Sequence, residues 1–245
     1  MAIFQQILNR TEQGRKQLAV LIDPDKLQNR DVERIAINAA KSGVDYFFVG
    51  GSLLVNNELD QCIKALKSNS EIPVLLFPGN TMQMSWKADA ILFLSLISGR
   101  NAEMLIGRHV IAAPYLKLSP LEVISCGYIL VESGKTTAVQ YMSNTVPIPS
   151  DKMDIAICTA MAGEMLGLKL IYLEAGSGAQ QSVPLAMIEQ VKQNINIPLI
   201  VGGGLRTPEK VREAAVAGAD IIVVGTALEK DPGMIAEMAE AVHLK

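Results

Sequence analysis

The chain has 245 residues, of which 49% are hydrophobic, and a formal net charge of −3. This length suits one parallel α/β barrel, and the charge provides no basic field for binding nucleic acid. The N-terminal sequence lacks a basic region followed by a long apolar stretch, and no apolar run approaches the roughly 18 residues that span a bilayer. We therefore expect a cytoplasmic protein with no stable membrane anchor and no nucleic-acid partner.

Three cysteines, Cys62, Cys126 and Cys158, lie far apart in the sequence. Their spacing does not match that of metal ligands, and an odd number fits a reducing compartment. We therefore expect buried structural thiols rather than a catalytic cysteine.

Eight short apolar runs recur along the chain and predict β-strands. They span residues 18–22, 45–49, 73–77, 90–94, 127–131, 169–173, 198–201 and 221–224. Amphipathic segments such as RDVERIAINAAKSG and PEKVREAAVAGA lie between most of them. Strands that are apolar on both faces and alternate with helices form parallel sheets covered by helices. Eight such units predict a single (β/α)₈ TIM-type barrel over residues 1–245.

Two intervals depart from this alternation. Between the third and fourth expected strands the chain offers only PGNTMQMSWKAD, which is short for a helical crossover. We therefore expect a degenerate third helix, which would leave one flank of the barrel thinly covered. Residues 132–151 are polar and rich in turn-forming residues, so they predict a long loop after the fifth strand.

Small residues follow each of the last three strands, in the segments AGSG (175–178), GGG (202–204) and GT (225–226). Active sites of such barrels lie at the C-terminal ends of the strands, and phosphate often binds after strands seven and eight. Glycine lets backbone N–H groups come close to an anion. A tight turn explains any one of these segments, but the three together favour a phosphate site.

The first two strands bring oxygen ligands to the same end of the barrel. IDPDK places Asp23 at the end of the first strand, and VGGS places Ser52 at the end of the second. A carboxylate and a hydroxyl suit Mg²⁺, which prefers oxygen ligands. Asp25 is explained at least as well as a turn aspartate.

The sixth strand supplies Tyr172 and Glu174, which are two residues apart and so lie on the same face. If Leu173 faces the helices, both side chains face the barrel interior or its mouth. Neither His109, in an apolar segment, nor His243, near the C-terminus, has the setting of a general base. The chemistry therefore falls to carboxylates, a metal and backbone dipoles.

IDPDK, VGGS, YLEAGSG, PLIVGGGLRTPEKV and GADIIVVGTALEK together resemble the geranylgeranylglyceryl phosphate synthase family, which includes bacterial heptaprenylglyceryl phosphate synthases. The resemblance implies a Mg²⁺-dependent prenyltransferase. The 3-hydroxyl of sn-glycerol 1-phosphate would attack C1 of a polyprenyl diphosphate, with geranylgeranyl diphosphate as the expected donor. The products would be an ether-lipid precursor and diphosphate. The barrel of this family also lacks a regular third helix.

The resemblance also assigns roles to individual residues. Asp23 and Ser52 would bind Mg²⁺, and Glu174 would be the catalytic base. The residues that would bind glycerol phosphate are Tyr172, Leu173, Glu174, Ala175, Gly176, Ser177, Gly178, Gly203, Gly204, Gly225 and Thr226. Many members carry a lysine two positions before the metal-binding aspartate, where this chain has Leu21, and Lys26 is the candidate replacement.

A prenyl tail needs a long apolar groove, which a flank without a helix would expose. TMQMSW (81–86) and ILFLSLIS (91–98) are the candidates to line it, although each also fits ordinary core and strand residues. We also expect a homo-oligomer, because such barrels commonly associate, and transient contact with membrane lipids, because the tail and product are lipidic.

Two other functions fit parts of the sequence. A phosphosugar isomerase-type barrel would share the last two phosphate loops and would need a second carboxylate after the fifth strand, where Glu132 is available. A barrel without catalysis would only bind a phosphorylated metabolite. YLEAGSG and the short third crossover disfavour the first alternative, and the presence of both Asp23 and Glu174 disfavours the second.

Overall fold

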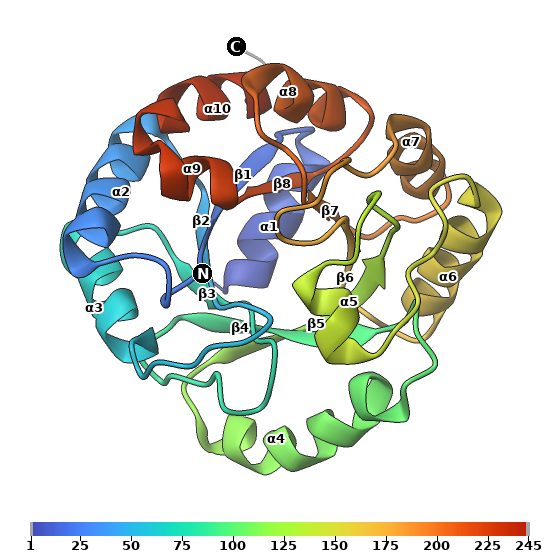
Figure 1. The fold of residues 1–245 in the computed structure, drawn as a ribbon, viewed down its shortest axis with the longest axis horizontal. Helices are drawn as coiled ribbons and strands as arrows, with labels where there is room; N and C mark the ends of the chain where they lie inside the picture. The colour runs from blue at the N-terminus through green and yellow to red at the C-terminus, as the bar shows by residue number, and fades with distance from the viewer. Residues whose placement is uncertain (1, 244–245) are drawn as a thin grey trace.

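Eight segments rich in Val, Ile and Leu form the strands of a closed barrel in the computed structural model, which describes residues 2–243 (Figure 1). Each strand pairs in parallel with the next, and β1 pairs with β8, so the TIM-type class expected from the sequence is confirmed. The strands are β1 (Gln17–Ile22), β2 (Tyr46–Val49), β3 (Val74–Leu76), β4 (Ala90–Leu96), β5 (Glu122–Leu130), β6 (Leu170–Glu174), β7 (Leu199–Gly202) and β8 (Ile221–Val224).

Helices surround this barrel as an outer ring (Figure 1). They are α1 (Ile3–Glu12), α2 (Asn29–Ser42), α3 (Leu59–Asn69), α4 (Arg108–Leu118), α5 (Ala138–Ser143), α6 (Met153–Met165), α7 (Leu185–Gln193), α8 (Pro208–Val216), α9 (Thr226–Lys230) and α10 (Ile235–Val242). A π-helical turn, Glu103–Gly107, precedes α4, and a short 3₁₀ turn, Pro232–Met234, precedes α10. Three helices lie within this ring in Figure 1: the short helices α5 and α9, and α1, which contributes Ile3 and Ile7 to the barrel interior.

Local sequence explains these helices. In α2 the buried residues Val32, Ile35, Ala36 and Ala39 recur at helical spacing, which gives the helix one apolar face. This helix ends at Gly43, whose φ of 75° suits the left-handed conformation that terminates helices.

The apolar residues form two layers. Side chains inside the barrel, such as Phe48, Leu75 and Tyr172, pack in one cluster, and those facing the helices, such as Phe47 and Leu173, pack in another. The alternation follows from the period of two along a strand. As expected, Tyr172 therefore points inward while Leu173 faces the helices.

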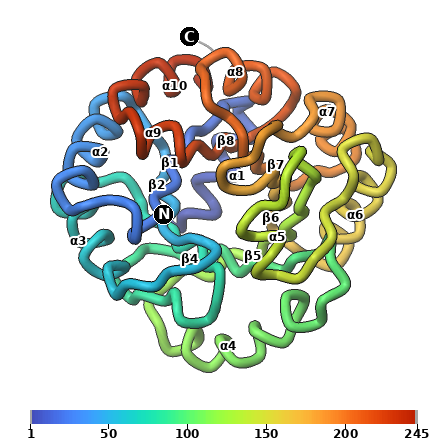
Figure 2. Tube along the Cα trace, viewed as in Figure 1, coloured from blue at the N-terminus to red at the C-terminus, as the bar shows by residue number. Residues whose placement is uncertain are grey.

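No helix covers the barrel between β3 and β4. The chain crosses there as a loop, residues 77–89, between α3 and α4 (Figure 2). The expectation of a degenerate third helix is confirmed.

Three details differ from the sequence-based expectations. β5 begins at Glu122 rather than near residue 127, because it pairs with the whole of β4 from Ala90 onward. The segment 132–151 contains a short helix, α5, rather than loop alone. Cys62 and Cys126 are buried as expected, but Cys158 is exposed on α6.

Within residues 2–243, no helix is both long enough and apolar enough to cross a membrane.

Candidate active site

A polar cavity occupies the barrel mouth, at the C-terminal ends of β1, β2, β6, β7 and β8. It encloses about 1110 Å³, including its opening. Most of the residues singled out in the sequence line it: Asp23, Ser52, Tyr172, Glu174, Gly176, Ser177, Gly178, Gly203, Gly204, Gly225 and Thr226. The side chains of Leu173 and Ala175 pack in the outer layer instead, so these two residues can offer a ligand only backbone atoms.

Glu174 ends β6 and is almost completely buried, at 4% exposure. Its Oε1 accepts a hydrogen bond from the backbone N–H of Gly176 at 2.6 Å. Burial raises the pKa of this carboxyl group from 4.5 to about 7, although the hydrogen bond from the Gly176 N–H opposes the rise. A carboxyl group with this pKa can take up and release a proton near neutral pH, as general acid–base catalysis requires.

The Tyr172 hydroxyl lies beside this carboxylate, since a Cβ on Gly202 would lie 2.3 Å from the hydroxyl oxygen and 2.9 Å from Oε2 of Glu174. It is buried and has no partner within hydrogen-bonding geometry among residues 2–243. Burial raises the pKa of Tyr172 well above its ordinary value, so the phenol stays protonated. The mouth therefore contains a neutral donor beside the candidate base.

Backbone amides also line the cavity. The N–H groups of Gly178, Gly203, Gly204, Gly225 and Thr226 donate to no acceptor within the part of the chain that the structure describes. Unpaired amides that line a cavity suit an anion with several oxygen atoms, such as phosphate.

Backbone conformation explains why several of these positions are glycine. Gly203 and Gly204 have φ of 83° and 72°, a region that side chains rarely adopt. A Cβ on Gly203 would lie 2.4 Å from Oε1 of Glu174. Gly225 differs, because its φ is −116°, so no left-handed backbone conformation requires glycine there.

Asp23, directly after β1, lies in a small charged cluster. Its Oδ2 pairs with Nζ of Lys26 at 2.8 Å, and its backbone N–H donates to Oε1 of Glu229 at 3.1 Å. Lys26 Nζ is also 3.9 Å from Oε2 of Glu229. Lys26 thus supplies a cation at the first strand, where Leu21 lines the cavity with an apolar side chain.

The oxygen atoms near Asp23 fit Mg²⁺. A Cβ on Gly51 would lie 3.3 Å from Oδ2 of Asp23, and Ser52, the next residue, lines the same cavity. Within residues 2–243, no three His, Cys, Asp or Glu side chains are grouped to hold a metal ion. Mg²⁺ does not need such a cluster, because it commonly binds through one or two protein oxygen atoms and keeps water and phosphate oxygen atoms as its other ligands. One carboxylate and one hydroxyl suit that kind of site.

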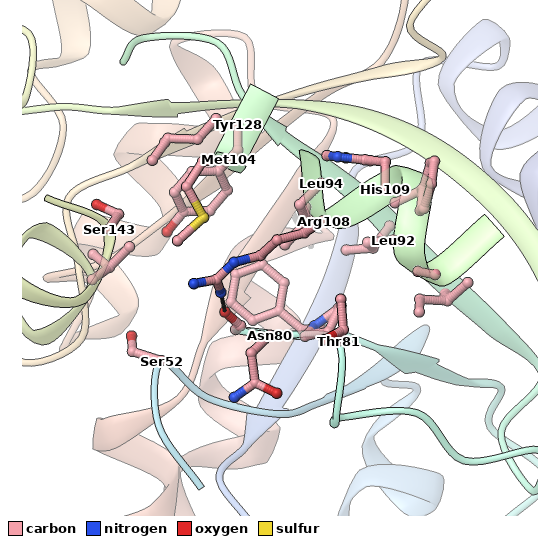
Figure 3. A pocket seen from close by; sticks show the side chains of 18 of the residues that line it. Ser52, Asn80, Thr81, Leu92, Leu94, Met104, Arg108, His109, Tyr128 and Ser143 are labelled. Carbon is pink, nitrogen blue, oxygen red and sulfur yellow. Dashed lines mark hydrogen bonds between the residues drawn. The ribbon is translucent and has the colours of Figure 1, made fainter. Parts of the chain in front are cut away.

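An apolar groove opens beside this mouth, along the flank that lacks a helix (Figure 3). It encloses about 930 Å³, including its opening, and lies between the 77–89 loop, β4 and α4. Thr81 and Met84 line it, whereas Met82 and Trp86 are exposed. From the other candidate segment, Ile91, Leu92, Phe93, Leu94 and Leu96 line it.

The groove and the mouth adjoin each other, because Gly51, Ser52, Phe77, Tyr128 and Val139 line both. Buried Gln83 fixes this junction. Its Nε2 donates to the carbonyl oxygen of Gly51 at 2.8 Å, and its Oε1 accepts from the N–H groups of Gly51 and Gly79. This side chain thus ties the end of β2 to the loop that replaces the third helix.

The remaining polar candidates have structural roles. Asp25 accepts a hydrogen bond from the N–H of Val55 at 2.6 Å, as a loop-tying aspartate does. His243 pairs with Asp45 before β2, at the opposite end of the barrel. His109 lines the groove and contacts Ser95, and burial lowers its pKa, so it carries no charge at neutral pH.

Sequence reasoning missed Glu229, Gln83 and Arg108. Glu229 lies in the first turn of α9, three residues after Thr226, and this spacing from the GT segment was available as a signal. Burial raises the pKa of Glu229. Gln83 and Arg108 carry no motif, because their positions depend on how the 77–89 loop and α4 fold against the barrel.

Comparison with known proteins finds close relatives over nearly the whole chain. Residues 11–242 match the PcrB family. A geranylgeranylglyceryl phosphate synthase of Chitinophaga pinensis is 53% identical over 241 residues, which cover 98% of this chain and 96% of the relative. One from Pyrococcus abyssi is 46% identical, with coverage of 89% and 86%.

A solved structure is also similar in three dimensions. The (S)-3-O-geranylgeranylglyceryl phosphate synthase of Thermoplasma acidophilum, in complex with its substrate sn-glycerol-1-phosphate, superimposes with a TM-score of 0.95. Its sequence is 35% identical, and the match covers all of both chains.

Proposed function

The chain belongs to the PcrB family and is a prenyltransferase of the geranylgeranylglyceryl phosphate synthase type, and we propose how its site carries out the transfer. The acceptor is sn-glycerol 1-phosphate, and the donor is a polyprenyl diphosphate. The observation that carries the proposal is the apolar groove, which joins a mouth lined by unpaired amides and a buried carboxylate.

The acceptor's phosphate binds among the loops after β6, β7 and β8. Gly178, Gly203, Gly204, Gly225 and Thr226 offer their free N–H groups to its oxygen atoms. The glycerol hydroxyl groups then reach Glu174, which lies against Gly203. A carboxylate among these donors orients the acceptor by accepting a hydrogen bond from its hydroxyl groups.

The donor lies across the junction between the mouth and the groove. Its tail occupies the groove, and its diphosphate lies beside Asp23 and Ser52. These two residues would hold Mg²⁺, which when bound neutralises the negative charge of a leaving diphosphate. Asp23 would supply a carboxylate ligand and Ser52 a hydroxyl ligand. The Asp23 carboxylate also forms an ion pair with Lys26.

The reaction exchanges one bond for another. The 3-hydroxyl oxygen of glycerol phosphate forms a bond to C1 of the prenyl chain, and the bond between C1 and the diphosphate oxygen breaks. The electron pair of that bond leaves with the diphosphate. The hydroxyl proton passes to Glu174, whose pKa near 7 lets it act as base and then release the proton.

Two features disfavour the alternatives. Glu132, which an isomerase would need in the mouth, is exposed and does not line the cavity. A barrel that only binds a phosphorylated metabolite has no use for an apolar groove beside its polar mouth.

The deciding experiment supplies the purified protein with geranylgeranyl diphosphate and Mg²⁺ and measures released diphosphate. We expect release only when sn-glycerol 1-phosphate is added. Release without the acceptor, or none in its presence, would contradict the proposed transfer.

We also propose that the protein works in the cytoplasm as a homo-oligomer with transient contact to lipid. The outer face of α4 and the preceding turn exposes large apolar side chains, at Ile106, Val110, Ile111, Tyr115 and Leu118. Such a patch suits self-association. Light scattering of Val110→Glu should then show a lower mass than the parent protein, and equal masses would exclude this surface.

A further inference from the structure

A cation, Arg108, lines the mainly apolar groove, and the proposed transfer reaction gives it no role. Arg108 is the first residue of α4, and its side chain extends across the groove toward the side where Asn80 and Ser52 lie (Figure 3). Its Nη1 donates to the carbonyl oxygen of Gly79 at 3.2 Å. Within residues 2–243, no carboxylate forms an ion pair with this guanidinium.

The contact with Gly79 fixes where the guanidinium lies. Gly79 packs directly on the end of β2, because a Cβ there would lie 2.3 Å from the carbonyl oxygen of Gly51 and 2.9 Å from the Cα of Ser52. Gln83 holds Gly51 and Gly79 together from the other side. The guanidinium therefore lies at the part of the groove that adjoins the mouth, where Gly79 packs against the proposed Mg²⁺ ligand Ser52.

A half-buried guanidinium in this position lacks partners for most of its hydrogen atoms. It carries five N–H donors, and the Gly79 carbonyl accepts from one nitrogen. The nearest acid in the groove lining is Glu103, one turn before it, which packs against Gly107 instead. The remaining N–H groups of Arg108 are therefore available to the diphosphate of the prenyl substrate, which must lie near this point if the prenyl tail fills the groove.

We propose that Arg108 binds the diphosphate of the prenyl donor and positions it against Ser52 and Asp23. This inference rests on the proposed function. A planar guanidinium matches the geometry of phosphate oxygen atoms with two parallel hydrogen bonds. Arg108 thus fixes the orientation of the donor: the diphosphate binds at the guanidinium, and the prenyl tail lies along the apolar lining beyond it.

The test measures donor binding alone. Isothermal titration calorimetry of geranylgeranyl diphosphate, with Mg²⁺ and without acceptor, compares the parent protein with Arg108→Met and Arg108→Lys. Loss of charge-assisted hydrogen bonds predicts about 10–100-fold weaker binding for Arg108→Met. Arg108→Lys keeps the positive charge but cannot donate two parallel hydrogen bonds, so its affinity for the donor should lie between those of the parent protein and Arg108→Met.

Two measurements separate this role from a structural one. Binding of sn-glycerol 1-phosphate should be the same in all three proteins, and KM should rise for the donor only. Arg100→Met is the matched control, because Arg100 also donates to a backbone carbonyl, that of Gly99, but is exposed and lies outside both cavities. It should bind the donor as the parent protein does.

Unchanged donor affinity in Arg108→Met would overturn the inference, as would an equal loss of affinity for donor and acceptor. These outcomes are distinct from a failure of the proposed function. If the parent protein makes no ether product, the transfer itself is wrong. If it does, and Arg108→Met keeps the parent's KM for the donor, only the role of Arg108 is wrong.

Discussion

Replacing Glu174 with glutamine should make the protein more stable and far less active. The variant keeps an acceptor for the Gly176 N–H but removes an ionisable group that burial holds at a pKa of about 7. An unfolded glutamate titrates near 4.5. One pKa unit corresponds to about 1.4 kcal/mol, so the interval from 4.5 to about 7 corresponds to about 3 kcal/mol of unfolding free energy.

The sign follows from proton binding. The folded protein holds this proton more tightly than the unfolded chain does, so the stability associated with neutral Glu174 is complete below pH 4.5. It is lost as the pH rises through about 7. Glutamine stays neutral throughout, so the variant should match the parent protein at low pH and exceed it by up to about 3 kcal/mol above pH 7.

Urea unfolding at pH 4.5 and pH 8.5 measures this difference. Glu132→Gln is the control, because this carboxylate is exposed, and the change should affect stability little at either pH. Equal stability of Glu174→Gln and the parent protein at pH 8.5 would show that burial does not raise the pKa of Glu174.

The kinetic part of the same prediction tests the role as base. Single-turnover rates with both substrates saturating should fall on the order of 10²–10⁴-fold, the usual loss for a general base. In the parent protein, the rate should rise with pH through about 7 as Glu174 ionises. A near-normal rate in the variant would leave Glu174 as a residue that only orients the acceptor.

Three further changes test the rest of the site. Asp23→Asn should leave the fold intact and abolish most of the activation by Mg²⁺, because an amide is a poor ligand for this ion; normal turnover at limiting Mg²⁺ would contradict the assignment. Gly204→Ala should weaken calorimetric binding of glycerol phosphate, whereas Gly14→Ala, at a similar φ of 69° but with no atom within 4 Å of the added Cβ, should cost only stability. Equal affinities in the two variants would exclude the Gly204 amide from the phosphate site. Ala112→Phe, on the groove face of α4, should raise KM for geranylgeranyl diphosphate more than KM for a shorter prenyl diphosphate. If both KM values changed equally, the prenyl tail would not lie along this part of the groove.

Strand order, barrel class and the missing third helix were all readable from the sequence. Apolar runs and helical spacing are local properties, and twelve residues between two strands are at the lower limit for a helical crossover. That Tyr172 and Leu173 point to opposite faces followed from the period of a strand, and the structure shows that Tyr172 is the one that points inward. The start of β5 was not readable from the sequence, because polar Glu122 and Ser125 interrupt the apolar run there, and these residues are fixed by pairing with β4.

Only the tertiary structure decided the properties that depend on distance between elements. The sequence named Glu174 as a base, but its pKa of about 7 arises because closure of the barrel removes the carboxyl group from water. Arg108 and Ser52 are separated by more than fifty residues, and the contact of Arg108 with Gly79 brings them to one junction. Glu229 reaches Asp23 in the same way, across the seam where β8 meets β1. Such contacts join residues with no shared local pattern, so the sequence determined the scaffold and the loops, while closure of the barrel determined the electrostatics of the site.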